Sequence, residues 1–343
     1  MRTLITALLA LATGAALTAT ALHTRTVPAA LPVPALAASG SAGSAAAVVS
    51  PDTDAATDDG LLPADGWPRN APSPEQVLYA QPRLMRQALD GLAPRVPGVP
   101  NLYLVSFAGD GSEDVFRNEA EYAATLFRHR YGARAHTLVL ENNPATLDNR
   151  PLASWSNLET ALTGIARAMD PQQDILMLYL TSHGDPEHTL LVDMDPLPLD
   201  QIGAPDLAGI LAEHPFKWKV VVVNACYSGG FVPPLQGDGT LVITAARSDR
   251  SSFGCGNDSA ATYFGRAWLV DALNRTADPI AAFRQADDEV ARWERKDRLT
   301  PSEPQISIGK GIADQLARWR HGDPVGPPVP FRPDGAGEAR ATR

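Results

Sequence analysis

Two residues suited to proton transfer and nucleophilic attack, a histidine and a cysteine, each follow an apolar run. Residues 174–182 lead into His183, and residues 219–225 lead into Cys226. Unbroken apolar runs are typical of parallel strands, because both faces of such a sheet are covered. Ligands and reactive groups collect beyond the carboxyl ends of parallel strands. We therefore expect His183 and Cys226 to meet at one edge of a sheet.

A cysteine reacts slowly at neutral pH unless a neighbouring base or positive charge converts its thiol to a thiolate. His183 can be that base if it lies against Cys226. Gly184 leaves space beside the imidazole, and Gly229 and Gly230 can bring backbone amides close to a developing oxyanion. Together the two motifs predict a cysteine hydrolase.

Two structural roles compete with catalysis at Cys226. A lone cysteine is most often a buried packing residue, although a glycine-rich turn directly after the strand argues against burial here. Cys255 is the other cysteine of the chain, and two cysteines in an oxidising compartment favour a disulfide. A bond between Cys226 and Cys255 would silence the nucleophile. A pocket thiol and a redox-controlled pair are both open alternatives for Cys255.

A metal alternative would join His183 to Glu187 and His188, with Asp193 or Asp195 as a further ligand. Helical zinc motifs need their ligands on one face of a helix. The proline before Glu187 and the spacing of the two histidines do not allow that helix. We predict no metal and no cofactor for the reaction.

An alternating order of strands and helices surrounds the two motifs. Apolar patterns predict strands at 99–107, 135–140, 175–181, 218–224, 241–246 and 304–308, and helices at 74–92, 113–131, 152–169, 204–214, 259–273 and 279–298. A short hairpin is expected between 184 and 199. Right-handed crossovers of such units build a layered α/β domain with a mostly parallel sheet.

Composition divides the 343 residues into four parts. Residues 1–22 have a positive start and an apolar stretch, as in a secretory signal peptide, and the stretch is long enough to be a membrane anchor instead. Residues 23–70 are rich in Ala, Pro and Ser, which predicts a flexible linker. The folded domain is expected at 71–320 and a disordered tail at 321–343. We therefore expect the protein to be exported to the periplasm or the extracellular space, either free or tethered to the membrane.

The chain is acidic, with a net charge of −10 and a sequence pI of about 5.2. A nucleic-acid partner would need a basic surface, so none is predicted. The expected partner is a peptide or protein substrate, and the sequence indicates no oligomeric state.

Residues 182–184 (Ser-His-Gly) and 224–229 (Asn-Ala-Cys-Tyr-Ser-Gly), each behind its apolar run, resemble the motifs of the legumain-like cysteine peptidases, family C13. Bacterial secreted members are the most similar. The family belongs to the caspase–legumain–gingipain clan, so the resemblance implies a caspase-like, layered α/β/α domain. It extends from about residue 101 to 271, and the Gln-Ala-Cys signature of caspases themselves is absent.

The resemblance implies roles for individual residues of the two motifs. Cys226 would be the nucleophile, and His183 would be the base and later the acid. The backbone amide of Gly184 would join that of Cys226 in holding the oxyanion. The family's histidine is oriented by an asparagine, where this chain has Val115. Asp110 is an alternative orienting residue, although an aspartate in a Gly-Asp-Gly sequence also suits a turn.

The family's asparagine-binding pocket implies a second set of residues. Arg117 matches the pocket arginine and Asp258 the pocket aspartate, with Ser252 in the segment before it. A guanidinium and a carboxylate together can satisfy the acceptor and donors of an amide. Asn224 stands where plant and animal members have a glutamate. Structural alternatives are a solvated helix arginine for Arg117 and a helix N-cap for Asp258.

We therefore predict a cysteine-type endopeptidase that uses a Cys-His dyad and a thioester acyl-enzyme, with Asn or Asp preceding the cleaved bond. A transpeptidase or transamidase would use the same dyad and the same thioester. An inactive caspase-like binding domain would keep the fold without the chemistry.

Overall fold

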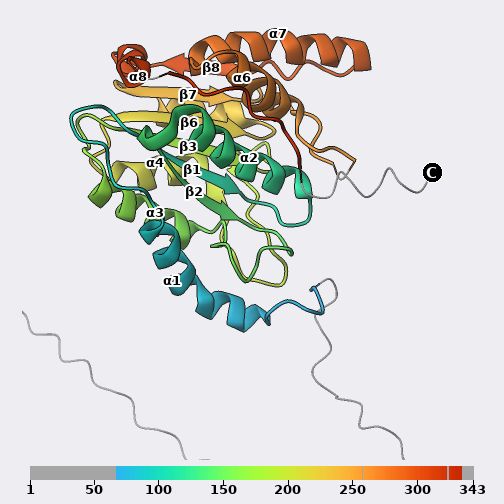
Figure 1. The fold of residues 1–343 in the computed structure, drawn as a ribbon. Coiled ribbons are helices and arrows are strands. Elements are labelled where there is room, and N and C mark those ends of the chain that lie inside the picture. The colour runs from blue at the N-terminus through green and yellow to red at the C-terminus, as the bar shows by residue number, and fades with distance from the viewer. Residues whose placement is uncertain (1–66, 257, 323, 334–343) are drawn as a thin grey trace, which may run out of the picture. The chain divides into compact units, whose positions relative to one another are not determined.

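A six-stranded sheet is the centre of the computed structural model, which describes residues 67–256, 258–322 and 324–333 (Figure 1). Its strands run in the order β2-β1-β3-β6-β7-β8. Their bounds are β1 (Leu102–Ala108), β2 (Ala135–Glu141), β3 (Ile175–Thr181), β6 (Trp218–Asn224), β7 (Thr240–Thr244) and β8 (Gln305–Ile308). All neighbours are parallel except β7 and β8, which are antiparallel. The predicted mostly parallel sheet is confirmed.

Helices cover both faces of the sheet (Figure 1). One layer consists of α2 (Asp114–Tyr131), the π-helix η3 (Gly265–Ala272), α6 (Leu273–Arg275), α7 (Pro279–Asp297) and α8 (Ile312–Arg320). The other layer consists of α1 (Pro74–Asp90), α3 (Trp155–Ala168), α4 (Ala204–Ala212) and α5 (Val232–Leu235). The fold is thus a three-layer α/β/α domain, as predicted.

Both faces of the sheet are buried, which explains why the sequences of the central strands are unbroken apolar runs. Along β3, Ile175, Met177 and Tyr179 pack into the core under α2, while the residues between them pack into the core under α3 and α4. Successive side chains of a strand point to opposite faces. Both sets must therefore be apolar, and periodicity alone could not assign a face to either.

A two-stranded hairpin follows β3 and leads the chain back over the carboxyl edge of the sheet. Its strands are β4 (Thr189–Leu190) and β5 (Ile202–Gly203). Isolated bridges join Gly184 to Leu190 and Asp110 to Asp193. The segment after His183 therefore lies against the turn between β1 and α2, and the predicted hairpin ends a few residues later than expected.

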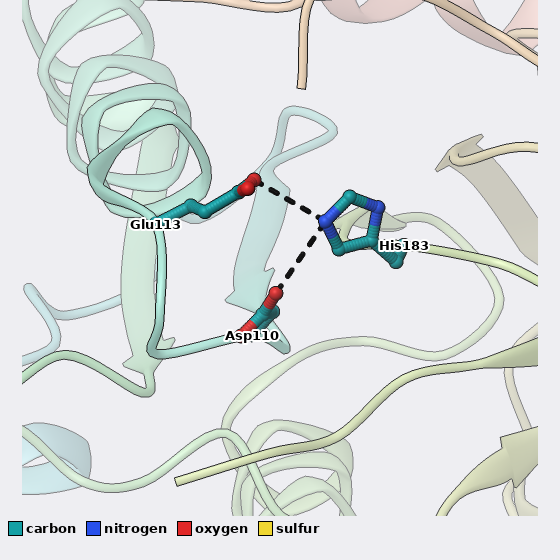
Figure 2. Close-up of side chains that lie close together, drawn as sticks. All are labelled: Asp110, Glu113 and His183. Carbon is teal, nitrogen blue, oxygen red and sulfur yellow. Dashed lines mark hydrogen bonds and ion pairs between the residues drawn. The ribbon is translucent and has the colours of Figure 1, made fainter. Parts of the chain in front are cut away.

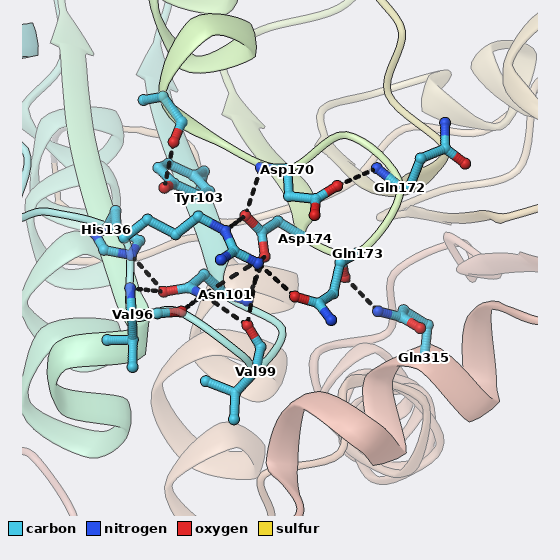
Figure 3. Close-up of polar contacts among 12 residues, drawn as sticks. Val96, Val99, Asn101, Tyr103, His136, Asp170, Gln172, Gln173, Asp174 and Gln315 are labelled. Carbon is cyan, nitrogen blue, oxygen red and sulfur yellow. Dashed lines mark hydrogen bonds and ion pairs between the residues drawn. The ribbon is translucent and has the colours of Figure 1, made fainter.

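A buried aspartate fixes the opposite, amino-terminal edge of the sheet (Figure 3). Asp174, directly before β3, is fully buried and accepts hydrogen bonds from Arg95 Nε at 2.6 Å and from the Asn101 amide at 2.8 Å. The Asn101 side chain in turn accepts from the Val96 amide at 3.0 Å and lies 3.0 Å from His136 Nε2. These contacts align the starts of β1 and β3, so the strands also end together.

Some elements differ from the expected ones. The helix expected from residue 259 begins later, as η3, and α8 was not predicted. Residues 324–333, which fall in the tail predicted from composition, contact α2. There the Tyr122 hydroxyl donates to the Val329 carbonyl at 2.7 Å and its ring meets Phe331 edge-on.

The predicted signal or anchor at 1–22, most of the predicted linker and residues 334–343 lie outside the described residues. Within the described ranges, no helix is both long and apolar enough to cross a bilayer.

Glu141, the last residue of β2, is a carboxyl group that the fold buries almost completely, with 1% of it exposed. Burial, together with the negative charge of Glu121, raises the pKa of Glu141 from 4.5 to about 7. The folded protein thus holds a proton on Glu141 over a pH range in which the unfolded chain has lost it.

This proton difference predicts a pH-dependent stability. Because the folded pKa is raised, the unfolded chain binds fewer protons between pH 4.5 and 7, so the contribution of Glu141 falls as pH rises through that window. We expect Glu141→Gln to remove about 2–3 kcal/mol of this decline. Urea unfolding at pH 5 and pH 8 measures it, with the exposed Glu75→Gln as the charge control. Parallel pH profiles for wild type and Glu141→Gln would contradict the assignment.

Candidate active site

The pairing of β3 with β6 brings the two predicted catalytic residues to the same edge of the sheet. Thr181 pairs with Asn224, and the Ser182 amide continues the ladder by donating to the Asn224 carbonyl at 3.3 Å. His183 and Cys226 each lie two residues beyond the paired positions Thr181 and Asn224. The two segments are still in contact at these positions. A Cβ added to Gly184 would lie only 2.4 Å from the Cys226 carbonyl oxygen. Gly184 therefore allows the two backbones to touch.

Two carboxylates hold the imidazole of His183 (Figure 2). Its Nε2 lies 3.2 Å from Glu113 Oε2 and 3.6 Å from Asp110 Oδ2, and its ring packs edge-on against Phe116. A carboxylate only accepts hydrogen bonds, so Nε2 carries the proton of a neutral ring. The lone pair is then on Nδ1, on the side of the ring away from the carboxylates. This tautomer leaves Nδ1 able to act as a base.

Asp110 combines the two roles that its sequence allowed. Its carboxylate accepts from the Ser112 amide at 2.8 Å and the Ser112 hydroxyl at 3.0 Å, which shapes the turn, and it also faces His183. Glu113, the nearer partner of His183, was not predicted. Its place three residues after Asp110, in the same turn, is the signal that the sequence offered.

Cys226 is hydrogen-bonded to the loop after β7. Its Sγ accepts from the Ser252 amide at 3.2 Å and lies 3.6 Å from the Ser252 hydroxyl. Within the described part of the chain, the hydrogen bonds of this thiol are to Ser252 and none is to His183. The backbones of the two segments are therefore in contact, whereas the side chains of His183 and Cys226 are not hydrogen-bonded to each other.

The turn after Cys226 is held in an unusual conformation by a second histidine. Tyr227 and His188 have φ angles of 55° and 61°, a region that non-glycine residues rarely adopt. The Tyr227 carbonyl accepts from His188 Nδ1 at 3.1 Å and from the Gly230 amide at 3.2 Å, while the Tyr227 amide donates to Arg250 at 2.7 Å. His188 thus binds the turn after Cys226, whereas the sequence suggested only a metal ligand at this position.

A buried carboxylate on α2 connects the segments that carry the site. Glu119 is fully buried and accepts five hydrogen bonds. Its donors are the side chains of Tyr179 and Thr181 in β3, the amide of Asn224 in β6, and the backbone amide and hydroxyl of Thr262. Burial raises the pKa of Glu119, and the hydrogen bonds from Thr181 and Thr262 oppose that shift. The sequence signal was a glutamate on the apolar face of a helix.

Asn224 belongs to this network and does not line an open pocket. Only 1% of it is exposed, and its Nδ2 lies 2.8 Å from Glu119 Oε2 and 2.9 Å from Thr262 Oγ1. Its Oδ1 is buried and has no hydrogen-bond partner among the described residues. The carboxylate of Glu119 needs donors, which explains why the amide of Asn224 turns inward.

Arg117 and Asp258, which are expected to bind the substrate side chain, lie on neighbouring segments. Asn118, next to Arg117, donates to the Ala260 carbonyl at 3.2 Å, two residues beyond Asp258. Arg117 is largely buried, lies 3.5 Å from Asp114, and lines a cavity of about 430 Å³ together with Glu141. Asp258 is exposed and lies well before the helical residues of η3, so it is not a helix N-cap.

Cys255 is a free thiol that packs beside the site, against the cluster containing Val115 and Phe116. Burial, together with the nearby Cys226 and Glu113, raises the pKa of Cys255 to about 11. The structure contains no disulfide between Cys255 and Cys226. Cys255 is therefore a weakly acidic thiol in this state.

Residues 157–315 match the model of one family, and that family is Peptidase C13. The predicted resemblance to the legumain-like peptidases is confirmed over this range. The match contains both His183 and Cys226, whereas Asp110, Glu113 and Arg117 lie before it.

Among solved structures, the chain is similar to a secreted C11 cysteine protease from Bacteroides thetaiotaomicron, determined in complex with an irreversible peptide inhibitor. The TM-score is 0.38 and the sequence identity 14%, over 58% of this chain and 59% of that one. The similar region is thus less than two thirds of the length of that protease. No curated protein matches the chain.

The contact between His188 and the cysteine turn predicts a suppressible defect. A Cβ at Gly230 would lie 2.0 Å from the His188 ring, so Gly230→Ala should cost about 1–3 kcal/mol of stability. Adding His188→Ala removes the clash, and the double variant should be more stable than Gly230→Ala alone. Urea unfolding measures this, with Gly237→Ala, where an added Cβ meets nothing within 4 Å, as control. Additive effects would contradict the contact.

The Glu119 network predicts a large effect from an isosteric change. Glu119→Gln replaces an acceptor by an NH₂ group that faces other donors, so we expect a loss of about 2–4 kcal/mol in the free energy of unfolding. Glu121→Gln, whose carboxylate forms a partly exposed pair with Arg150, should cost less than about 1 kcal/mol. Denaturant unfolding compares the two. Equal stability of the two variants would show that the network contributes little.

Proposed function

We propose that the protein is a cysteine endopeptidase in which Cys226 is the nucleophile and His183 the general base. The observation that supports this most directly is the paired exit of β3 and β6, with Gly184 in contact with the Cys226 backbone. Nucleophilic catalysis requires a base within reach of the thiol, and the carboxyl edge of a parallel sheet is where reactive groups collect.

The reaction follows from the chemistry of these groups. His183 Nδ1 takes the proton of the Cys226 thiol, and the thiolate attacks the carbonyl carbon of the peptide bond. The amine leaves with the proton from His183, and a thioester remains on the sulfur. Water, deprotonated by His183, then attacks the thioester and releases the acid and the thiol. This mechanism requires the Cys226 thiol to lie against the His183 imidazole. The thiol must therefore turn away from Ser252, or substrate binding must bring the two side chains together.

Backbone and loop groups supply the electrostatic support. The amides of Gly184 and Cys226 are the proposed donors to the oxyanion, since they lie on two backbones in contact at the nucleophile. The Ser252 amide, which donates to Sγ in the resting state, stabilises negative charge on the sulfur. Glu113 and Asp110 hold the Nε2–H of His183, so both act as positioning residues.

We propose that Arg117 and Asp258 set the preference for asparagine or aspartate before the cleaved bond. Both side chains lie on segments that meet at the Asn118–Ala260 hydrogen bond. A guanidinium can bind the side-chain carbonyl or carboxylate, and a carboxylate can accept from an amide. In this arrangement Asn224 contributes through Glu119 and not by contact with substrate.

Export of the folded domain is also a proposal, and it rests on the composition of residues 1–22. A protease that acts outside the cytoplasm would meet peptide and protein substrates there. Residues 71–320 would then form the peptidase domain.

Cleavage of a peptide library by the purified protein tests the assignment. Cys226→Ala and His183→Ala should each lower kcat/KM by roughly 10³-fold or more, because the two groups act as one unit. Cys255→Ser, which removes the other thiol, should keep most of the activity. The cleaved positions report on Arg117 and Asp258, and products joined to an added amine would indicate transpeptidation.

Retention of cleavage by Cys226→Ala would disprove the proposed nucleophile. Failure of the wild-type protein both to cleave peptides and to react with a peptide-based thiol reagent would favour an inactive binding domain.

A further inference from the structure

The His183 side chain faces more negative charge than an orienting role needs. Asp110 and Glu113 have 2% and 17% of their side chains exposed, and both lie within ion-pair distance of the same imidazole nitrogen (Figure 2). In the described part of the chain, the ion pairs of these two carboxylates are with His183. Even a protonated imidazole would balance only one of two charges. Buried carboxylates are normally paired or coordinate a metal ion.

The geometry of the three groups is close to that of a metal site. One ligand atom from each of Asp110, Glu113 and His183 can be chosen so that all lie within 4.8 Å of one another. Zinc binds imidazole nitrogen and carboxylate oxygen at about 2.0–2.2 Å, so tetrahedral ligands are separated by about 3.3–3.6 Å. The two measured separations from Nε2 are 3.2 and 3.6 Å. Small side-chain shifts would therefore complete three corners of a tetrahedron.

We propose that Asp110, Glu113 and His183 bind a divalent transition-metal ion, zinc in the first instance, and that this binding inhibits the enzyme. The nitrogen ligand favours zinc and related ions over magnesium and calcium, which prefer oxygen ligands alone. The set shares only His183 with the ligands that the sequence suggested, because His188 is engaged with the turn after Cys226.

Metal binding would change which nitrogen of His183 carries the proton. The Nε2 proton must leave when the metal binds there, and the proton of the neutral ring is then on Nδ1. Nδ1 consequently has no lone pair to accept a proton from Cys226. Inhibition rests on the proposed function, whereas binding of the ion does not.

The thiol of Cys226 is not one of the ligands of the proposed site. The Cys226 sulfur is hydrogen-bonded to Ser252, and the three ligand atoms come from Asp110, Glu113 and His183 alone. Replacement of the thiol should therefore leave metal affinity unchanged, which separates this site from a simple zinc–cysteine adduct.

Titration of the full-length protein with Zn²⁺, in competition with a chromophoric chelator, tests the proposal. Cys226→Ala should bind one equivalent with the affinity of wild type. Glu113→Gln and Asp110→Asn should each weaken binding at least about 10-fold, and His183→Ala more strongly. Glu187→Gln, an exposed glutamate of the alternative set, should have no effect. Circular dichroism confirms that each variant is folded.

Two results would overturn the proposal. One is loss of zinc binding in Cys226→Ala, which would make the thiol a ligand, and the other is unchanged binding in folded Glu113→Gln. If the protein cleaves peptides, Zn²⁺ should inhibit wild type reversibly and Glu113→Gln should need at least about 10-fold more metal. If no cleavage is found, the binding measurement still decides whether the metal site exists.

Discussion

The carboxylate of Glu119 is the contact on which the arrangement of the site depends. It lies in the layer between α2 and the sheet and accepts hydrogen bonds from β3, from β6 and from Thr262. His183 follows β3 and Cys226 follows β6, while the segment that ends at Thr262 contains Ser252. A buried carboxylate is tolerated only when donors surround it, so burying Glu119 requires these three segments to lie in one relative position.

The outer side of the site is held by different means. Two left-handed residues, Tyr227 and His188, are joined by a hydrogen bond, and Gly230 makes room for the imidazole. Backbone strain of this kind persists only where surrounding contacts over-determine it. Together with the network at Glu119, these contacts fix the backbone near Cys226, whose side chain is hydrogen-bonded to Ser252.

Much of the fold could be predicted from the sequence, and the two central strands most closely. Residues 175–181 and 218–224 have the predicted bounds, because long apolar runs have few alternatives to a buried parallel strand. Helix α8 was missed because Ile312, Leu316 and Trp319 form a short apolar stripe within a charged segment. Glu113 and Glu119 were missed because the signals that the sequence offers, a place in the Asp110 turn and a place on the apolar face of a helix, do not name their partners, which come from distant segments.

The amino-acid sequence by itself determined that a histidine and a cysteine end two buried strands, because apolar runs and the residues that follow them are local properties. Tertiary structure decided which groups surround them. Asp110 and Glu113 face His183, His188 supports the turn after Cys226, and the amide of Asn224 donates to Glu119. These partners are distant in sequence, and burial and hydrogen bonding select among them only when the chain is folded.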